Sequence, residues 1–199
     1  MTTTTHIEYH VKFEELTDDQ KSKVIDNNRD INVDFDWHEF CIDDCREIGN
    51  ILGFEMKNIY FSGFHSQGDG ACFTGGFSHN KGFLDKIKKD YSSEPTLIQI
   101  ASDLHNLYRK SFYSVNGQIT HRGHYSHERS MSLDISNYYN DIKGHVDENE
   151  WLDVIADFAN WIYKKLESEY EFQTSDEQVM ESLVSNEIEF EVDEDGELV

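Results

Sequence analysis

The chain has 199 residues, of which 37% are hydrophobic, and its 40 acidic and 17 basic residues give a net charge of −23. This length and apolar content suit one domain with a real core. The charge argues against direct binding to DNA or RNA, because such binding depends on Lys and Arg side chains that neutralise phosphates. No apolar run reaches membrane length and no signal segment is visible, so the sequence predicts a soluble, cytoplasmic protein that does not contact membranes.

The excess negative charge lies at the two ends of the chain. Residues 1–50 contain 13 acids and 5 bases, and residues 151–199 contain 15 acids and 2 bases, whereas residues 51–100 are neutral. A field of this kind steers a protein toward basic partners. The sequence therefore favours a partner protein with a basic surface.

The first third of the chain predicts one strand and two helices. Residues 7–13 alternate apolar and polar side chains, which is the pattern of a strand. Thr17 and Gln20 have the spacing of a capping box for a helix that runs to about residue 28. A second helix is predicted over residues 34–52, with Gly53 as its stop.

Two aromatic-rich runs, residues 58–66 and 71–78, predict a central hairpin. The Gly68-Asp69-Gly70 sequence between them favours a tight turn, because Gly tolerates positive φ. Asp69 is then a turn residue. The alternative is that Gln67 and Asp69 belong to a small binding loop.

The middle of the chain predicts helices over residues 81–91 and 95–110, the second of which begins at Pro95. A second hairpin is predicted from residues 118–126 and 130–136, turning at 127–129. The expected fold class is therefore α+β, with an antiparallel sheet built from two hairpins and covered by several helices.

The last third predicts a long amphipathic helix over residues 150–170 and a further helix capped near residues 174–177. The final stretch, residues 186–199, has the pattern of an acidic edge strand or a mobile tail. We expect one globular domain over residues 1–199, with mobile ends at 1–6 and 193–199.

A polar face of the sheet is the alternative place for chemistry. Cys72, His124 and Asp134 have the side-chain types of a nucleophilic catalytic set. His124 and His127 with Asp134 form the alternative metal set, although His121 and His127 would lie roughly 20 Å apart on a straight strand. These sets define the alternative function, a small hydrolase or nucleotide-processing enzyme with or without a metal; the leading interpretation has no catalytic residues and no cofactor.

Three stretches resemble one family of small proteins from bacteriophage and prophage genomes, labelled antitoxin of a toxin–antitoxin stability system. They are residues 59–75 (IYFSGFHSQGDGACFTG), 119–135 (ITHRGHYSHERSMSLDI) and 158–190 (FANWIYKKLESEYEFQTSDEQVMESLVSNEIEF). Family members often carry Trp where this chain has His65. The resemblance implies a phage accessory protein that neutralises a host factor, and it transfers no catalytic residue.

The leading hypothesis is an acidic binding protein that inhibits a host nucleic-acid-acting protein. Its targets would be a toxin or a restriction, CRISPR or other anti-phage defence factor, and its carboxylates would replace the phosphates of DNA or RNA. The residues expected to bind the partner form two clusters: Asp34, Asp36, Glu39, Asp43 and Asp44, and Glu187, Glu189, Glu191, Asp193, Glu194 and Asp195. The oligomeric state stays open.

Overall fold

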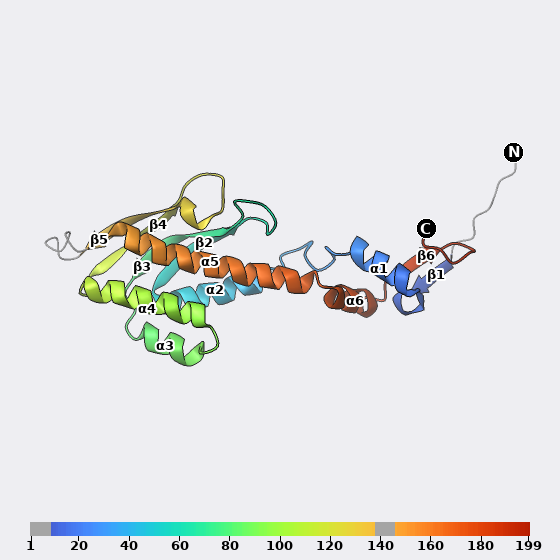
Figure 1. Ribbon diagram of the computed structural model, residues 1–199, viewed down its shortest axis with the longest axis horizontal. Helices are drawn as coiled ribbons and strands as arrows, with labels where there is room; N and C mark the ends of the chain where they lie inside the picture. Colours follow the sequence, from blue (N-terminus) through green and yellow to red (C-terminus); the bar gives the residue numbers. More distant parts are fainter. Residues whose placement is uncertain (1–8, 138–145) are drawn as a thin grey trace. The chain divides into compact units, whose positions relative to one another are not determined.

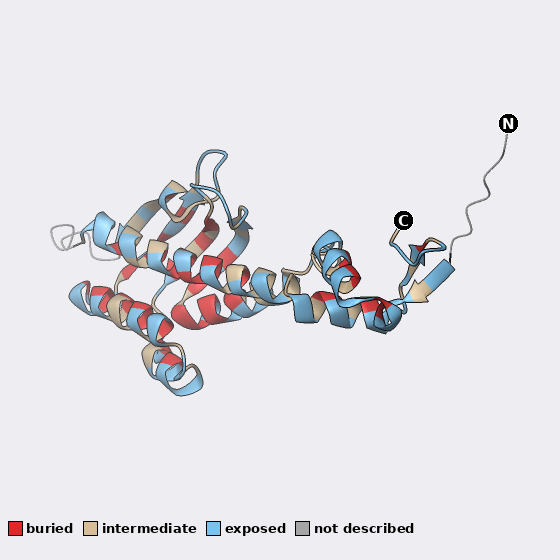
Figure 2. Cartoon of the chain, turned by 45° about the vertical axis from the view of Figure 1, so that its right-hand side comes forward, coloured by how far each residue is buried: buried red, intermediate tan, exposed pale blue. Residues whose placement is uncertain are grey.

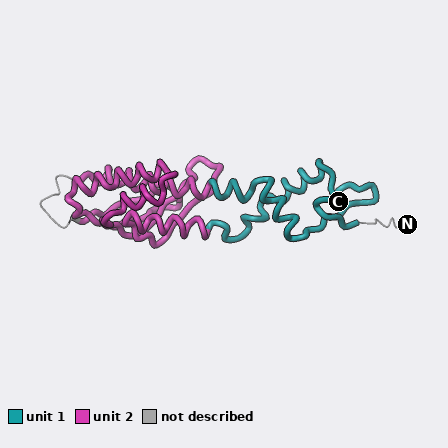
Figure 3. Tube along the Cα trace, turned by 90° about the horizontal axis from the view of Figure 1, so that it is seen from below, with its two compact units in different colours: residues 1–38, 168–199 teal, residues 39–167 magenta. Residues whose placement is uncertain are grey.

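A computed structural model of the chain describes residues 9–137 and 146–199 (Figure 1). The chain divides into two compact units, a smaller unit of residues 1–38 and 168–199 and a larger unit of residues 39–167 (Figure 3). The expectation of a single domain stays a prediction, because two compact units can still unfold together. The described helices and strands are β1 (Tyr9–Lys12), the 3₁₀ helix η1 (Phe13–Glu15), α1 (Asp18–Asn27), α2 (Glu39–Leu52), β2 (Phe54–Phe61), β3 (Ala71–Ser78), α3 (Phe83–Asp90), α4 (Pro95–Lys110), β4 (Val115–His121), the 3₁₀ helix η2 (Glu128–Ser130), β5 (Met131–Asn137), α5 (Glu148–Gln173), α6 (Asp176–Ser185) and β6 (Glu189–Val192).

The larger unit contains a four-stranded antiparallel sheet with the strand order β2-β3-β4-β5. The β2–β3 and β4–β5 pairs are the two hairpins, and the β3–β4 pairing joins them side by side. This arrangement confirms the expected α+β class and the antiparallel sheet.

A helical layer covers the aromatic face of this sheet. The ring of Phe158 on α5 stacks on Phe54 with centroids 5.3 Å apart, and Phe77 packs against Trp151 of the same helix at 5.5 Å. Tyr108 of α4 meets Trp151 edge-on at 4.8 Å, so α4 and α5 share one core (Figure 2). Burying large aromatic side chains in this way contributes about 1.5–3 kcal/mol for each ring.

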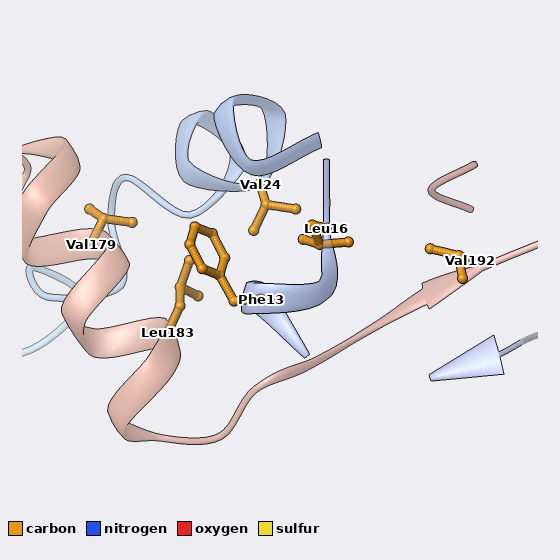
Figure 4. Close-up of a cluster of buried hydrophobic side chains, with 6 residues drawn as sticks. All are labelled: Phe13, Leu16, Val24, Val179, Leu183 and Val192. Atoms are coloured by element: carbon orange, nitrogen blue, oxygen red, sulfur yellow. The ribbon is translucent and has the colours of Figure 1, made fainter. Parts of the chain in front are cut away.

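The smaller unit is built from both terminal regions of the chain. Strand β1 pairs antiparallel with β6, with Tyr9 opposite Val192. Figure 4 shows its core cluster, which consists of Phe13, Leu16, Val24, Val179, Leu183 and Val192. The predicted strands near both ends are thus present and pair with each other.

The two expected mobile ends have different outcomes. The end at residues 1–6 lies outside the described residues. The end at residues 193–199 forms a turn in which the Asp193 N–H donates to the Glu197 carbonyl at 2.9 Å, and Val199 N–H donates to the Glu191 carbonyl at 3.1 Å. The mobility of this segment stays a prediction.

Several predicted helix starts are confirmed. Thr17 and Gln20 form the expected capping box of α1, Pro95 occupies the first turn of α4, and Ser175 caps α6. The predicted helix over residues 34–52 is wrong in its first part, because α2 begins only at Glu39. Residues before it form turns, and the Trp37 ring there packs on Tyr170 with centroids 5.7 Å apart.

The predicted hairpin turns are too short. Strand β2 begins at Phe54 and ends at Phe61, so residues 62–70 form a loop rather than a tight turn. The second hairpin likewise closes through residues 122–130, because β4 ends at His121 and β5 begins at Met131. Among residues 9–137 and 146–199, no helix combines the length and apolar character needed to cross a membrane.

Candidate functional site

The acidic residues are concentrated in the smaller unit. Its 70 residues contain 21 acids and 4 bases, for a charge of −17, whereas the larger unit has 19 acids and 13 bases. One of the four bases is already engaged, because the Arg29 guanidinium binds Asp26 at 2.8 Å and Asp176 at 2.5 Å. These carboxylates raise the pKa of Arg29 through hydrogen bonds. The smaller unit therefore presents a surface on which negative charge is scarcely compensated.

The C-terminal acidic cluster lies on β6 and the segments around it. Glu187, Glu189, Glu191, Glu194 and Asp195 are exposed. Strand pairing places Lys12 opposite Glu189 and His10 opposite Glu191, so only two of these acids face a basic or titratable residue across the strands. Asp193 has a structural task, since its carboxylate accepts the N–H groups of Asp195 at 3.0 Å and Glu197 at 2.9 Å.

The sequence predicted that the other acidic cluster lies on one helix, and this prediction is wrong. Asp34 and Asp36 lie in the turns before α2 and belong to the smaller unit. Glu39, Asp43 and Asp44 lie on α2 in the larger unit, where Asp43 also pairs with Arg46 at 2.6 Å. All five side chains are exposed. The prediction placed them on one helix because it started that helix at residue 34 instead of Glu39.

In the loop of residues 62–70, Asp69 is a structural residue. Its carboxylate accepts the N–H groups of His65 at 3.0 Å and Ser66 at 2.6 Å, which closes the loop from within. Gln67 at the tip is exposed. The Ser62 hydroxyl donates to the Ser126 carbonyl at 3.4 Å, so this loop lies against the loop of residues 122–130.

The alternative catalytic set is not assembled. Cys72 is fully buried, and burial raises the pKa of its thiol. Asp134 is exposed on β5, opposite Gln118, which in turn pairs with Gly76. Two strand spacings and four residues therefore separate Asp134 from Cys72, which is roughly 16 Å between their Cα atoms. A nucleophile needs its base within hydrogen-bonding reach.

The alternative metal set is not assembled either. In the part of the chain that the structure describes, no group of three or more His, Cys, Asp or Glu side chains is placed to hold an ion. His124 is exposed in its loop, while His127 Nδ1 accepts the Arg129 N–H at 3.2 Å and caps η2. His121 Nε2 lies 2.9 Å from the Tyr125 carbonyl. His121 and His127 therefore stabilise the loop.

A cavity that the sequence did not indicate lies beside the end of β3 in the larger unit. It has a volume of about 660 Å³ and is lined by His79, Lys81, Phe83, Asp85, His105 and Tyr113, among others. Tyr113 reaches it from a left-handed backbone conformation, with φ of 59°, next to Phe112 at 52°. That conformation costs about 1–2 kcal/mol for a residue other than Gly. No sequence pattern marks it, since Ser111-Phe112-Tyr113-Ser114 has no Gly or Asn.

Residues 37–176 match the family described as a domain of unknown function, DUF8835. The match spans 140 of the 199 residues, so the chain belongs to this family. It includes the whole larger unit, whereas most of the acidic smaller unit lies outside it. No curated protein and no solved structure shows a significant match.

Proposed function

We propose that the chain is an acidic binding protein whose smaller unit captures a basic surface of a partner protein. The observation that carries this proposal is the separation of charge, −17 on the 70 residues of the smaller unit against −6 on the larger unit. Complementary charge raises the association rate and disfavours partners of like charge. A surface so rich in carboxylates is complementary to the basic surface of a partner that normally binds the phosphates of nucleic acid.

The partner class follows from this chemistry and from the resemblance of three stretches to phage-encoded antitoxin-like proteins. The proposed target is a host nucleic-acid-acting protein, such as a toxin nuclease or an anti-phage defence factor. Carboxylates on β6 and the following turn would occupy its phosphate-binding residues. Binding of this kind competes with nucleic acid and weakens steeply as salt rises, because counterion screening shortens the range of the attraction.

The test starts with affinity capture from bacterial lysate and continues with the purified partner. One variant replaces Glu189, Glu191, Glu194 and Asp195 by Gln or Asn; its control replaces the same number of exposed acids on the larger unit, Glu47, Glu55, Asp134 and Asp153. Both variants have the same net charge. We expect the first to lose at least tenfold in affinity and the second to lose little.

Equal losses in the two variants would contradict the assignment of the surface, because only the overall charge would then matter. A second readout is competition: a short DNA or RNA duplex should displace the protein from its partner. A partner that binds nucleic acid and this chain at the same time would refute the mimicry while leaving the interaction itself intact.

A further inference from the structure

The cavity beside His79 offers three kinds of chemistry that converge on one small ligand. Its volume of about 660 Å³ falls within the range of roughly 300–1,000 Å³ that small-molecule sites occupy. It lies entirely within the larger unit.

The first kind of chemistry is a wall of rings. His79 and Tyr113 have centroids 4.7 Å apart, and His105 lies 6.1 Å from Tyr113 and 6.0 Å from Phe83. We call these four side chains the ring wall; Phe83 is buried, so His79, His105 and Tyr113 present its accessible ring surface. Flat aromatic ligands stack on such surfaces, and nucleobases do so whatever their sequence identity, because every base has a π-face.

The second kind of chemistry is a site for an anion. Lys81 lines the cavity directly before α3, and Gly82 at the N-cap provides no side-chain hydrogen bond to the first turn. The Phe83 N–H already donates to the Asn80 carbonyl at 3.4 Å, whereas the N–H groups of Leu84 and Asp85 have no partner within the helix. Such N–H groups at the start of a helix attract phosphate. Residues 79–91 carry four lysines and two aspartates, so this segment is positive within a chain of net charge −23.

The third kind of chemistry is a single acceptor. Asp85, in the first turn of α3, also lines the cavity. A carboxylate at this place repels a phosphate group electrostatically, so it does not bind the phosphate itself. It can accept hydrogen bonds from sugar hydroxyl groups, as acidic residues do for ribose in dinucleotide-binding folds.

We propose that this cavity binds a nucleoside monophosphate, with the base against the ring wall, the phosphate at Lys81 and the first turn of α3, and the ribose hydroxyls at Asp85. The left-handed conformation of Phe112 and Tyr113 fits this role, because it turns the Tyr113 ring toward His79. Unfavourable backbone conformations of this kind cluster at ligand sites. The site is separate from the acidic surface and does not depend on the proposed function.

The probes are AMP, GMP, CMP and UMP, with adenosine and inorganic phosphate as partial ligands. Binding to the full chain is followed by NMR, through the imidazole signals of His79 and His105, and by calorimetry. We expect at least one nucleotide to saturate the protein, with shifts at both imidazoles, and to bind at least tenfold more tightly than adenosine or phosphate.

Two pairs of variants locate the site. Lys81→Gln should weaken nucleotide binding about tenfold, whereas Lys88→Gln, also on the lysine-rich segment but outside the cavity, should not. Tyr113→Gly removes a ring of the ring wall and also removes the cost of the left-handed backbone conformation at that position. Phe112→Gly removes the same backbone cost at the neighbouring position and leaves the ring wall intact. Only the Tyr113 variant should lose nucleotide affinity.

Several results would overturn the proposal. These are the absence of binding by all four nucleotides, equal affinity for phosphate alone or adenosine alone, and equal losses within either pair of variants. Because Lys81 and Lys88 are exposed, their variants should fold, and thermal unfolding checks this.

Discussion

The imidazole of His79 is held toward its neutral form by its surroundings. Partial burial and the nearby His105 both lower the pKa of His79. A histidine with a lowered pKa binds fewer protons in the folded than in the unfolded state. The contribution of His79 to the stability of the protein is therefore complete above the pKa of the unfolded state. It is lost as the pH falls from that pKa through the lower pKa of the folded state.

The first prediction concerns this pair of histidines. His105→Ala removes the repulsion and admits water, so the pKa of His79 should rise toward its ordinary value. An NMR titration of the His79 ring protons measures the change. His38→Ala, which replaces a histidine of the smaller unit, is the control and should leave the titration unaltered. A His79 pKa that stays the same or falls in the His105 variant would show that His105 has no part in lowering it.

A second prediction at this scale concerns Tyr108. Its ring is fully buried, and within the described residues its hydroxyl has no hydrogen-bond partner. Burial also raises the pKa of the phenol. Because an unpaired buried hydroxyl costs about 1–3 kcal/mol, Tyr108→Phe should leave the free energy of unfolding unchanged or raise it by about 1 kcal/mol. Urea denaturation measures this, and a clear loss of stability would indicate that the hydroxyl is bonded in solution.

Among the elements, Gly53 joins the end of α2 to the sheet. Its φ is 95°, and its carbonyl accepts the Ser78 N–H at 3.0 Å, which closes the β2–β3 pair. A Cβ at this position would collide with the Ser78 carbonyl oxygen. Only glycine satisfies both the backbone conformation and the close approach.

This junction gives the third prediction. Gly53→Ala should destabilise the protein by at least about 2 kcal/mol more than Gly68→Ala. Gly68 is the matched control, since its φ of 100° is nearly the same but a Cβ there meets nothing within 4 Å. Gly68→Ala should cost only about 1 kcal/mol, the strain of the left-handed conformation alone. Similar losses in both variants would mean that the collision is relieved by a small shift of β3.

Helix starts with a local signal were predictable from the sequence, whereas the conformations of the loops were not. Thr17, Pro95 and Ser175 start their helices through contacts within a few residues, so their patterns were sufficient. The tight turn at Gly68-Asp69-Gly70 was wrong because Asp69 instead bonds the backbone of His65 and Ser66. The ring wall was missed because the conformation of Tyr113 has no signature in the sequence.

For the whole molecule, the concentration of like charge is the dominant electrostatic property. A net charge of −23 destabilises a compact state through self-repulsion, and salt screens that repulsion within roughly 10 Å at 0.1 M. Most of the charge lies on the smaller unit, so the effect should be greatest there.

The fourth prediction follows from this repulsion. Raising sodium chloride from about 0.02 to 0.5 M should raise Tm by several degrees, since each kcal/mol corresponds to about 2–4 °C in a chain of this size. The variant with neutral residues at positions 189, 191, 194 and 195 should start higher and gain less. Calorimetry measures the Tm of both proteins at the two salt concentrations. A Tm that falls as salt rises would mean that attractive ion pairs outweigh the repulsion.

The pairing of β1 with β6 has a consequence for synthesis on the ribosome. Tyr9 cannot pair with Val192 until Val192 has been synthesised. At about 5–20 residues per second, the intervening chain takes roughly 10–40 s to make. Every strand of the larger sheet has left the ribosome well before then. The sheet of the larger unit can therefore begin to form first, whereas the acidic surface is completed only after β6 has been made. A nascent chain that still lacks β6 cannot engage a basic partner through its finished surface.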